Sequence, residues 1–412
     1  MARKSDPLLD WARSAGAALG PAFVGATQPL APLGLLDVLI RGADLVFLGE
    51  LDHFVHEKSD CRILLCRYLL SRGWRSFAEE LSWSDGLRVA RFLNGVGGLE
   101  RLSLFGYRGD LREDRDDYPT GVFRASFDLY PTALMAAEQG RFYRGLRSAA
   151  AGAAVAYHGL DVDGLPGGGY ADIADALAPF AAEPSVQAFM RSLARIAGES
   201  AAAESGRLSA LVRQAVALGV PAAAQVDVSL RSMAESLSYI DITYPAKTYE
   251  ATAPGMAFRE GCMKRRFGEI RALTDDAPMV VMGHGLHLAK DDRLLRSTVG
   301  VGPGGGQECS LGHHLVQVLG LKTVSIWLVH GAGEDSQPFP DLPRRFAYPA
   351  DTLNRRLAPL AVPTLIPIAG APPGLFDRPI GVGHMYNAVQ QVVLDGQVDA
   401  ILYLPQVTPM RL

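Results

Sequence analysis

Short runs of bulky hydrophobic residues, each bounded by glycine, aspartate or proline, recur along the chain and predict buried β-strands. These runs cover residues 45–49, 75–81, 153–161, 278–283, 322–330 and 398–404, with a weaker one at 363–369. Between them apolar residues recur at helical spacing, most clearly over 57–72, which ends at Gly73, a natural C-cap position. Because strands that alternate with helices form parallel β-α units, we expect an α/β fold with a mainly parallel central sheet flanked by helices.

The pattern changes between about residues 170 and 250, which are rich in alanine and contain no histidine. Two or three long amphipathic helices are predicted there, around ESGRLSALVRQAVALG and DVSLRSMAESLSYID. We therefore divide the chain into an α/β core that carries the active site, residues 1–165 and 255–412, and a helical insertion at 166–254. The insertion is expected to cover the cleft like a lid, and a helical layer with no gating role is the alternative. Glycine-rich runs at 167–169 and 300–306 predict mobile loops.

Histidines gather at the ends of the predicted strands. Six of the nine lie at or just beyond the end of a hydrophobic run, most of them beside glycine. LVFLGELDH places Glu50 and His53 after one strand, and MVVMGHGLH places His284 and His287 after another. The carboxyl ends of parallel strands share one edge of a sheet, where α/β proteins bind their ligands. We therefore expect an imidazole cluster in a single cleft.

Composition narrows the class of protein. A chain of 412 residues that is 48% hydrophobic and 20% charged can bury a large core. A formal charge of −4 and the lack of a basic stripe argue against a nucleic-acid partner. Charged residues interrupt the N-terminal segment, which disfavours a secretory signal, and no run approaches the roughly 18 apolar residues of a membrane span. The four cysteines fit neither a disulfide framework nor a CxxC metal site, so we expect a cytoplasmic protein; its oligomeric state stays unknown.

Several catalytic motifs are absent from the sequence. It contains no GxSxG nucleophile elbow, no HExxH and no P-loop. The run GVGPGG at 300–305 satisfies GxGxxG, but no strand precedes it and Pro303 interrupts it, so we do not expect a dinucleotide there.

What remains is a set of histidines and carboxylates suited to water activation. The pKa of histidine lies near neutral pH, and a flanking carboxylate such as Glu50 can hold one tautomer of His53 and raise its basicity. An ester carbonyl under attack gains negative charge, which a second imidazole or Arg62 can stabilise. The alternative is a metal held by Glu50 together with His53, His284 and His287, although HxxH after a strand is not a specific metal signature.

Other polar residues have structural interpretations. We expect His56 to cap or solvate the first turn of the helix at 57–72, and His313 and His314 to be packing or surface residues. Glu79 and Glu80 are adjacent in a strand, so they face opposite sides and only one of them can reach the cleft. The roles of His158, His330 and His384 stay open.

With these motifs the chain resembles the erythromycin esterase family, whose members hydrolyse macrolide lactones. The matching positions, listed along the chain, are Gly49, Glu50, His53, Glu57, Arg62, Gly73, Trp74, Glu80, Gly159, Leu160, Asp161, His284 and His287, followed by SLGHHL and VDAILYLPQVTP. The resemblance covers nearly the whole chain in the family's order. It departs from the family at Asp52, Phe54 and Gly285, and residues 106–130 fit the family poorly.

The resemblance implies an α/β core with helical additions, and His53 as the base that deprotonates water. It implies supporting catalytic roles for Glu50, Arg62, Glu80, His284 and His287, with no cofactor and no obligatory metal. The expected activity is a hydrolase that opens an ester or lactone of a macrolide or related natural product, as in antibiotic resistance. One alternative is a cyclase or acyl transferase of natural product biosynthesis on the same scaffold. The other is a protein that binds a metal or haem without turnover.

Overall fold

The structure is a computed structural model, and it describes residues 6–20, 23–100, 102, 132–162, 167–196, 201–243, 253–297, 310–337 and 341–412. Two segments lie outside the described residues: 106–130, which fits the family poorly, and 300–306, where we predicted a mobile loop. The chain divides into two compact units. Unit 1 comprises Met1–Ala78, Ala133–Ala156 and Asp276–Leu412, and unit 2 comprises Glu79–Thr132 and Tyr157–Asp275.

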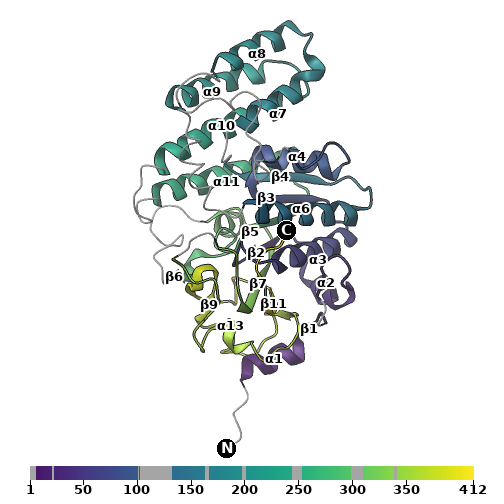
Figure 1. The fold of residues 1–412 in the computed structure, drawn as a ribbon, viewed down its shortest axis with the longest axis vertical. Helices are drawn as coiled ribbons and strands as arrows, with labels where there is room; N and C mark the ends of the chain where they lie inside the picture. Colours follow the sequence, from purple (N-terminus) through teal and green to yellow (C-terminus); the bar gives the residue numbers. More distant parts are fainter. Residues whose placement is uncertain are drawn as a thin grey trace, which may run out of the picture. The chain divides into compact units, whose positions relative to one another are not determined.

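An eight-stranded sheet forms the centre of the fold (Figure 1). Its strands, in spatial order, are β1 (Ala17–Ala18), β8 (Thr364–Pro367), β11 (Ala400–Val407), β7 (Thr323–Gly333), β2 (Leu45–Glu50), β5 (Met279–His284), β3 (Ser76–Ser82) and β4 (Ala156–Asp161). β2 is parallel to β5 and to β7, and β7 is parallel to β11, whereas β8 is antiparallel to β11 and β1. The mainly parallel α/β fold is thus confirmed, and each predicted strand is present within a few residues of its expected ends.

The strands at the middle of the sheet are buried on both faces, which explains their continuous hydrophobic runs. Every residue of β2 and β5 is buried. Helices α3 (Glu57–Ser71) and α6 (Thr132–Ala150) lie side by side, where the Ser59 hydroxyl donates to the backbone carbonyl of Glu138 (Figure 1). Gly73, with φ of +90°, follows α3 in the left-handed conformation that a helix C-terminus favours, as predicted.

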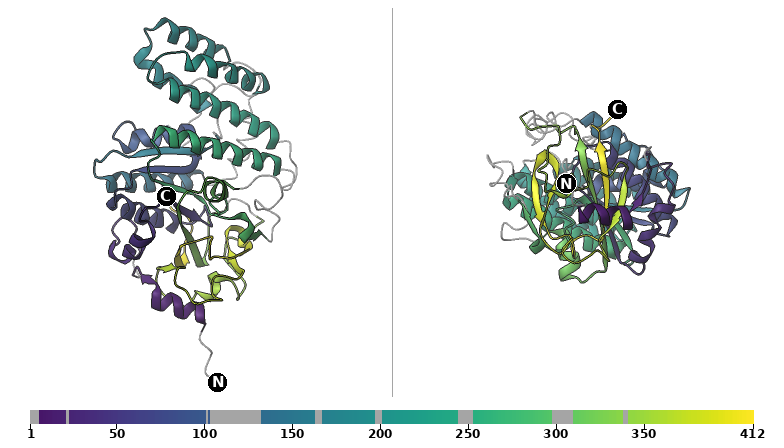
Figure 2. Two further views of the ribbon diagram at one scale, coloured as in Figure 1. Left: turned by 180° about the vertical axis from the view of Figure 1, so that it is seen from behind. Right: turned by 90° about the horizontal axis from the view of Figure 1, so that it is seen from below.

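Near the N-terminus, α1 (Pro7–Ala15) packs against β8. In Figure 2, α1 is the purple helix next to the N-terminal segment. A second, antiparallel sheet in unit 1 consists of β6 (Leu295–Ser297), β10 (Val389–Val392) and β9 (Ile380–Gly383). The sequence did not indicate these strands, because they are only three or four residues long. The remaining short elements of unit 1 are η1 (Ala31–Leu35), α2 (Leu36–Leu39), η5 (Asp292–Leu294), α12 (Leu311–His313), the π-helix η7 (His314–Val318), α13 (Leu353–Arg356) and η8 (Met385–Asn387).

Unit 2 is built mainly of helices. They are α4 (Trp83–Leu93), α7 (Gly167–Leu177), η3 (Ala178–Phe180), α8 (Pro184–Ile196), α9 (Ala201–Val216), α10 (Ala223–Thr243) and α11 (Ala253–Leu273). Their apolar faces form one core, in which Phe189 of α8, Leu208 of α9 and Leu230 of α10 are buried. Residues 170–250 therefore hold more helices than the two or three that we expected, because α7 and α8 lie there in addition to α9 and α10. Gly167 opens α7, so the prediction of a mobile loop at 167–169 was wrong.

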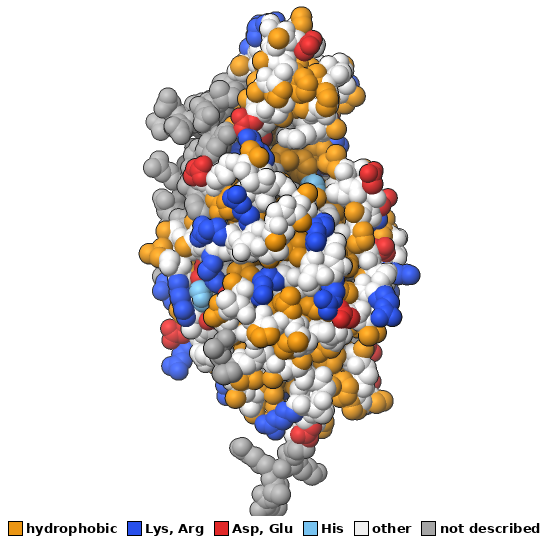
Figure 3. Space-filling view, turned by 90° about the vertical axis from the view of Figure 1, so that its right-hand side faces the viewer, with side chains coloured by type: hydrophobic (Ala, Val, Ile, Leu, Met, Phe, Trp, Pro, Cys, Tyr) orange, Lys and Arg blue, Asp and Glu red, His pale blue; other side chains and the backbone are white. Residues whose placement is uncertain are grey.

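Positive and negative side chains are mixed over the face shown in Figure 3, where lysines and arginines lie scattered among hydrophobic and acidic groups. Among the residues that the structure describes, no helix is long and apolar enough to cross a membrane. The lid-like role of the helical insertion stays a prediction.

Candidate active site

The candidate site lies in unit 1, at the carboxyl end of β2. Glu50 is the last residue of β2, and a short loop leads from it through His53 to α3. The Nδ1 atom of His53 lies 2.6 Å from Oε1 of Glu50. The Glu50 carboxylate is nearly inaccessible, whereas the His53 side chain is 30% exposed. The loop thus presents one edge of a buried acid–imidazole pair to solvent.

Helix α3 brings two cations to the same carboxylate. Nη2 of Arg62 lies 2.8 Å from Oε2 of Glu50, and Nζ of Lys58 lies 3.5 Å from Oε1. Lys58 also donates to the backbone carbonyl of His53 at 2.8 Å. Lys58 and Arg62 are four residues apart, so they share one face of the helix. Helix α3 thus places Arg62 on Glu50, at the end of β2.

These partners keep Glu50 ionised. Burial opposes its charge, but Arg62, Lys58 and His53 outweigh burial and hold the pKa of Glu50 well below its usual range. An ionised carboxylate only accepts hydrogen bonds, so the hydrogen on Nδ1 of His53 points to Glu50. The other ring nitrogen, Nε2, is then the basic atom of a neutral His53.

The neighbouring strand supplies a second imidazole. Glu50 pairs with His284 in the parallel register of β2 and β5. The rings of His53 and His284 have centroids 5.1 Å apart, and those of His284 and His287 are 6.4 Å apart at a near-perpendicular angle. The structure therefore brings together five of the predicted site residues: Glu50, His53, Arg62, His284 and His287.

The tautomer of His284 follows from its local hydrogen bond. The backbone N–H of Leu286 donates to Nδ1 of His284 at 3.2 Å, so that nitrogen carries no hydrogen. A neutral His284 then has its hydrogen on Nε2 and is a hydrogen-bond donor there. His284 itself is 3% exposed.

A third imidazole continues this row. His384, which follows β9, packs edge-on against His284 with centroids 6.3 Å apart. Its ring is buried, and neither ring nitrogen has a hydrogen-bond partner among the described residues. Burial lowers the pKa of His384 to about 4. Next to it, the Tyr348 hydroxyl donates to the backbone carbonyl of His384 at 3.0 Å and lies 2.8 Å from Nε2 of His330.

Glu80, the remaining predicted site residue, belongs to unit 2. There Nη2 of Arg259, on α11, lies 2.6 Å from Oε1 of Glu80, and the same guanidinium binds Asp161 at the end of β4. Glu79 instead accepts a hydrogen bond from the Tyr157 hydroxyl. The two adjacent glutamates therefore have separate partners, as expected of neighbours in a strand. No sequence signal identified Arg259, because it lies far along the chain from both carboxylates.

The structure corrects the interpretation of His56. Its backbone takes the N-cap position of α3, but its side chain makes no capping hydrogen bond. Instead, Nδ1 of His56 binds the carboxylate of Glu138 on α6, which Arg141 also contacts at 2.7 Å. His313 accepts a hydrogen bond from the backbone of Asp292 and is partly buried, which agrees with a packing role.

Among the described residues, no group of three or more histidine, cysteine or acidic side chains is placed to hold a metal ion. Of the residues that the sequence did not single out, Lys58 had a usable signal, its spacing of four from Arg62. Tyr348 had none, because its contacts depend on the tertiary fold.

No protein-family model matches the chain. Three solved structures are similar to it over almost their whole length. A protein from Bacillus cereus matches with a TM-score of 0.68 and 14% identity, covering 98% of each chain. A succinoglycan biosynthesis protein matches with a TM-score of 0.66 and 15% identity, over 98% of this chain and 97% of that one. A mutant erythromycin esterase in its open conformation matches with a TM-score of 0.61 and 17% identity, over 97% and 98%. At these identities the similarity establishes the fold.

Proposed function

We propose that the protein is a hydrolase that opens an ester or lactone of a natural product, with His53 as the general base. The observation that carries the proposal is the pairing of His53 with the buried, ionised Glu50. This pairing leaves Nε2 of His53 as the basic atom beside a partly exposed edge of the loop. The similarity in fold to an erythromycin esterase supports an ester or lactone as the substrate class.

In the proposed reaction, Nε2 of His53 removes a proton from water as the water oxygen attacks the carbonyl carbon. The carbonyl oxygen becomes an oxyanion, and the Nε2–H of His284 donates a hydrogen bond to it. When the tetrahedral intermediate collapses, the bond from carbon to the alcohol oxygen breaks and His53 returns its proton to the leaving alkoxide. Water is consumed, and an acid and an alcohol are formed.

Glu50 and Arg62 assist this step through their contacts with His53 and with each other. Glu50 holds the His53 ring and stabilises the imidazolium that forms, as the carboxylate does in a Ser-His-Asp triad. Arg62 and Lys58 keep that carboxylate ionised. A supporting role for Glu80 and for His287 follows from the resemblance to the family and stays a prediction.

The test is mass spectrometry of a panel of macrolides and simpler esters after incubation with the purified protein. Hydrolysis of a lactone adds the mass of one water to the substrate. An acyl transferase would instead transfer the acyl group to an added alcohol or amine, and a cyclase would remove one water. A panel in which no ester or lactone gains water contradicts the proposed function.

A further inference from the structure

Two buried aspartates meet next to the proposed base. Asp52 directly precedes His53 in the loop between β2 and α3, and Asp335 follows β7. Asp52 is 2% exposed and Asp335 is 1% exposed. The two carboxyl groups lie close enough for each to affect the pKa of the other. Two carboxyl groups that are buried together repel each other when both are ionised, so another interaction must offset this repulsion.

The hydrogen bonds of the two carboxyl groups show which oxygen of each is left without a donor. Oδ1 of Asp52 accepts from the backbone N–H of Phe54 at 2.7 Å, and Oδ1 of Asp335 accepts from the backbone N–H of Gln337 at 3.2 Å. Each carboxyl therefore has its Oδ2 left over. Both Oδ2 atoms are buried, and neither has a donor among the described residues. Ionised carboxylates only accept hydrogen bonds, so a bond between these two groups requires a hydrogen on one of them.

We propose that Asp52 and Asp335 share one proton, and that this carboxyl pair is a positioning device that fixes the loop carrying His53 to the segment after β7. The device extends the proposed function, since it adds residues that act through the base rather than on the substrate. The shared proton itself does not depend on which reaction the site performs.

The backbone around the pair supports a fastening role. Next to Asp52, the carbonyl of Phe54 accepts from the N–H of Ser336 at 3.0 Å. On the other side, the carbonyl of Leu51 accepts from the N–H of Met385 at 2.9 Å. The carboxyl pair lies between these two backbone bonds along the loop. Loss of its proton would place two charges between them and push the loop away from the 335–337 segment.

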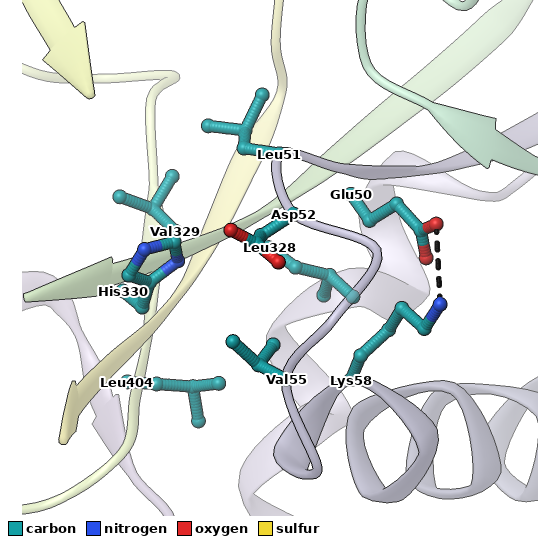
Figure 4. Close-up of a pocket in the computed structure, with 9 residues that line it drawn as sticks. All are labelled: Glu50, Leu51, Asp52, Val55, Lys58, Leu328, Val329, His330 and Leu404. Atoms are coloured by element: carbon teal, nitrogen blue, oxygen red, sulfur yellow. Dashed lines mark ion pairs between the residues drawn. The ribbon is translucent and has the colours of Figure 1, made fainter. Parts of the chain in front are cut away.

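The surroundings offer little to neutralise a second charge. Asp52 lines a small pocket, and in Figure 4 its carboxyl lies between His330 on one side and Glu50 with Lys58 on the other. Lys58 is already paired with Glu50, whose negative charge also faces Asp52. Arg344 faces Asp335, and the Tyr348 hydroxyl lies near both carboxyls. Neither aspartate forms an ion pair with a cation in the described residues.

The protonation equilibrium agrees with this geometry. Burial, with the neighbouring Asp335, raises the pKa of Asp52 well above its usual range, and burial raises the pKa of Asp335 to about 6. A carboxyl whose pKa is raised by folding contributes stability that is present at low pH and lost as pH rises through the folded-state pKa. The pair should therefore hold at least one proton at neutral pH and should lose its last proton toward alkaline pH.

The experiment measures the melting temperature of the full chain from about pH 6 to about pH 10, for the wild type and for Asp52→Asn. Asparagine resembles a protonated carboxyl and can donate to Asp335 at every pH. We expect the wild-type Tm to fall toward alkaline pH by roughly 2–4 °C more than that of the variant. Equal alkaline slopes would overturn the proposal. Asp291→Asn is the matched control, because Asp291 also accepts from the N–H two residues on but faces Arg293, so its alkaline slope should match the wild type.

Asp335→Asn provides the same test from the other side of the pair and should also flatten the alkaline slope. If both asparagine variants fail to fold near neutral pH, the shared proton is contradicted, because a neutral amide should replace a protonated carboxyl. The second readout is the pH profile of kcat/KM on any ester that the protein hydrolyses, whose alkaline limb should move to higher pH in Asp52→Asn. The thermal test needs no substrate, so it can succeed or fail independently of the proposed hydrolase activity.

Discussion

The Glu50 carboxylate binds His53 at 2.6 Å through Oε1 and Arg62 at 2.8 Å through Oε2. One buried group thus connects the loop that follows β2 to the helix α3. Arg62 keeps the carboxylate ionised, and the ionised carboxylate fixes the orientation and the tautomer of His53. The basic Nε2 atom is therefore set by contacts that do not involve a substrate.

From this relationship we predict that His53→Ala lowers kcat by roughly 10²–10⁴-fold, the usual contribution of a general base. The fold should be unaffected, since the His53 side chain is partly exposed and its loop is held by backbone hydrogen bonds. Steady-state kinetics with an active ester, together with circular dichroism, checks both points.

His313→Ala is the control for the loss of one imidazole, because the side chain of His313 contacts Asp291 and the backbone N–H of Asp292 rather than the proposed catalytic residues. Its activity should stay within about twofold of the wild type, as expected of a substitution away from the reacting groups. A His53→Ala protein that keeps half of its activity would rule out His53 as the base.

The fully buried strands and the end of α3 could be predicted from the sequence, because each shows in the local pattern of residues. β2 and β5 are buried on both faces and therefore read as unbroken hydrophobic runs, and Gly73 marks the end of α3. β9 and β10 were missed because strands of four residues do not show a reliable period. β10 also pairs with β6, which lies far away in the sequence, so this contact has no local signal.

The residues of the candidate site also divide into those that the sequence predicted and those that it did not. Strand ends and helical spacing led to Glu50, His53 and Arg62, since all three lie close together in the sequence. The packing of the Asp52 loop against the segment that holds Asp335 could not be predicted, because it joins loops that follow two different strands. The partner of Glu80 was equally hidden, as Arg259 lies on α11 with no motif around it.

We predict that His284→Ala and His287→Ala lower kcat more than they raise KM. The reason is that a donor to the developing oxyanion acts in the transition state rather than in substrate binding. Removal of one such donor typically costs roughly 10²–10³-fold in kcat. Steady-state kinetics of both variants on one ester decides the matter, and an unchanged kcat with raised KM in both would mean that these histidines only shape the pocket.

Activity is expected to survive removal of metal ions, because the sequence contains neither HExxH nor a cysteine–histidine ligand spacing. The protein would be dialysed against a chelator, assayed, and then assayed again after addition of zinc or manganese. Activity that disappears on chelation and returns with either metal would contradict this prediction.

Glu138 should make stability depend on pH in the acidic range. Burial opposes its charge, but hydrogen bonds from His56 and Arg141 outweigh burial and lower the pKa of Glu138 to about 2. A carboxyl whose pKa is lowered by folding contributes stability above its unfolded-state pKa, here near 4.5, and loses it as pH falls toward the folded value. The Tm of Glu138→Gln should therefore be below that of the wild type near neutral pH.

That difference in Tm should shrink steadily below about pH 4.5, which thermal unfolding at a series of pH values will measure. Glu183→Gln is the control, because Glu183 is exposed and should give a Tm close to the wild type throughout. A gap between wild type and Glu138→Gln that is constant from about pH 7 to about pH 3 would show that the carboxylate charge is not what stabilises this site.

A catalytic role of Glu80 can be distinguished from a structural role by comparing Glu80 with Asp161, because both carboxylates bind the guanidinium of Arg259. Arg259 binds both Glu80 and Asp161 in unit 2, so Glu80→Gln and Asp161→Asn each remove one charge from the same ion-pair network. Breaking either pair should lower Tm by a similar amount, because both carboxylates are mostly buried with their partner. If Glu80 supports catalysis, as the family resemblance implies, Glu80→Gln should lower kcat at least about tenfold more than Asp161→Asn. Equal kcat values for the two variants, measured on the same ester, would leave Glu80 with the structural role alone.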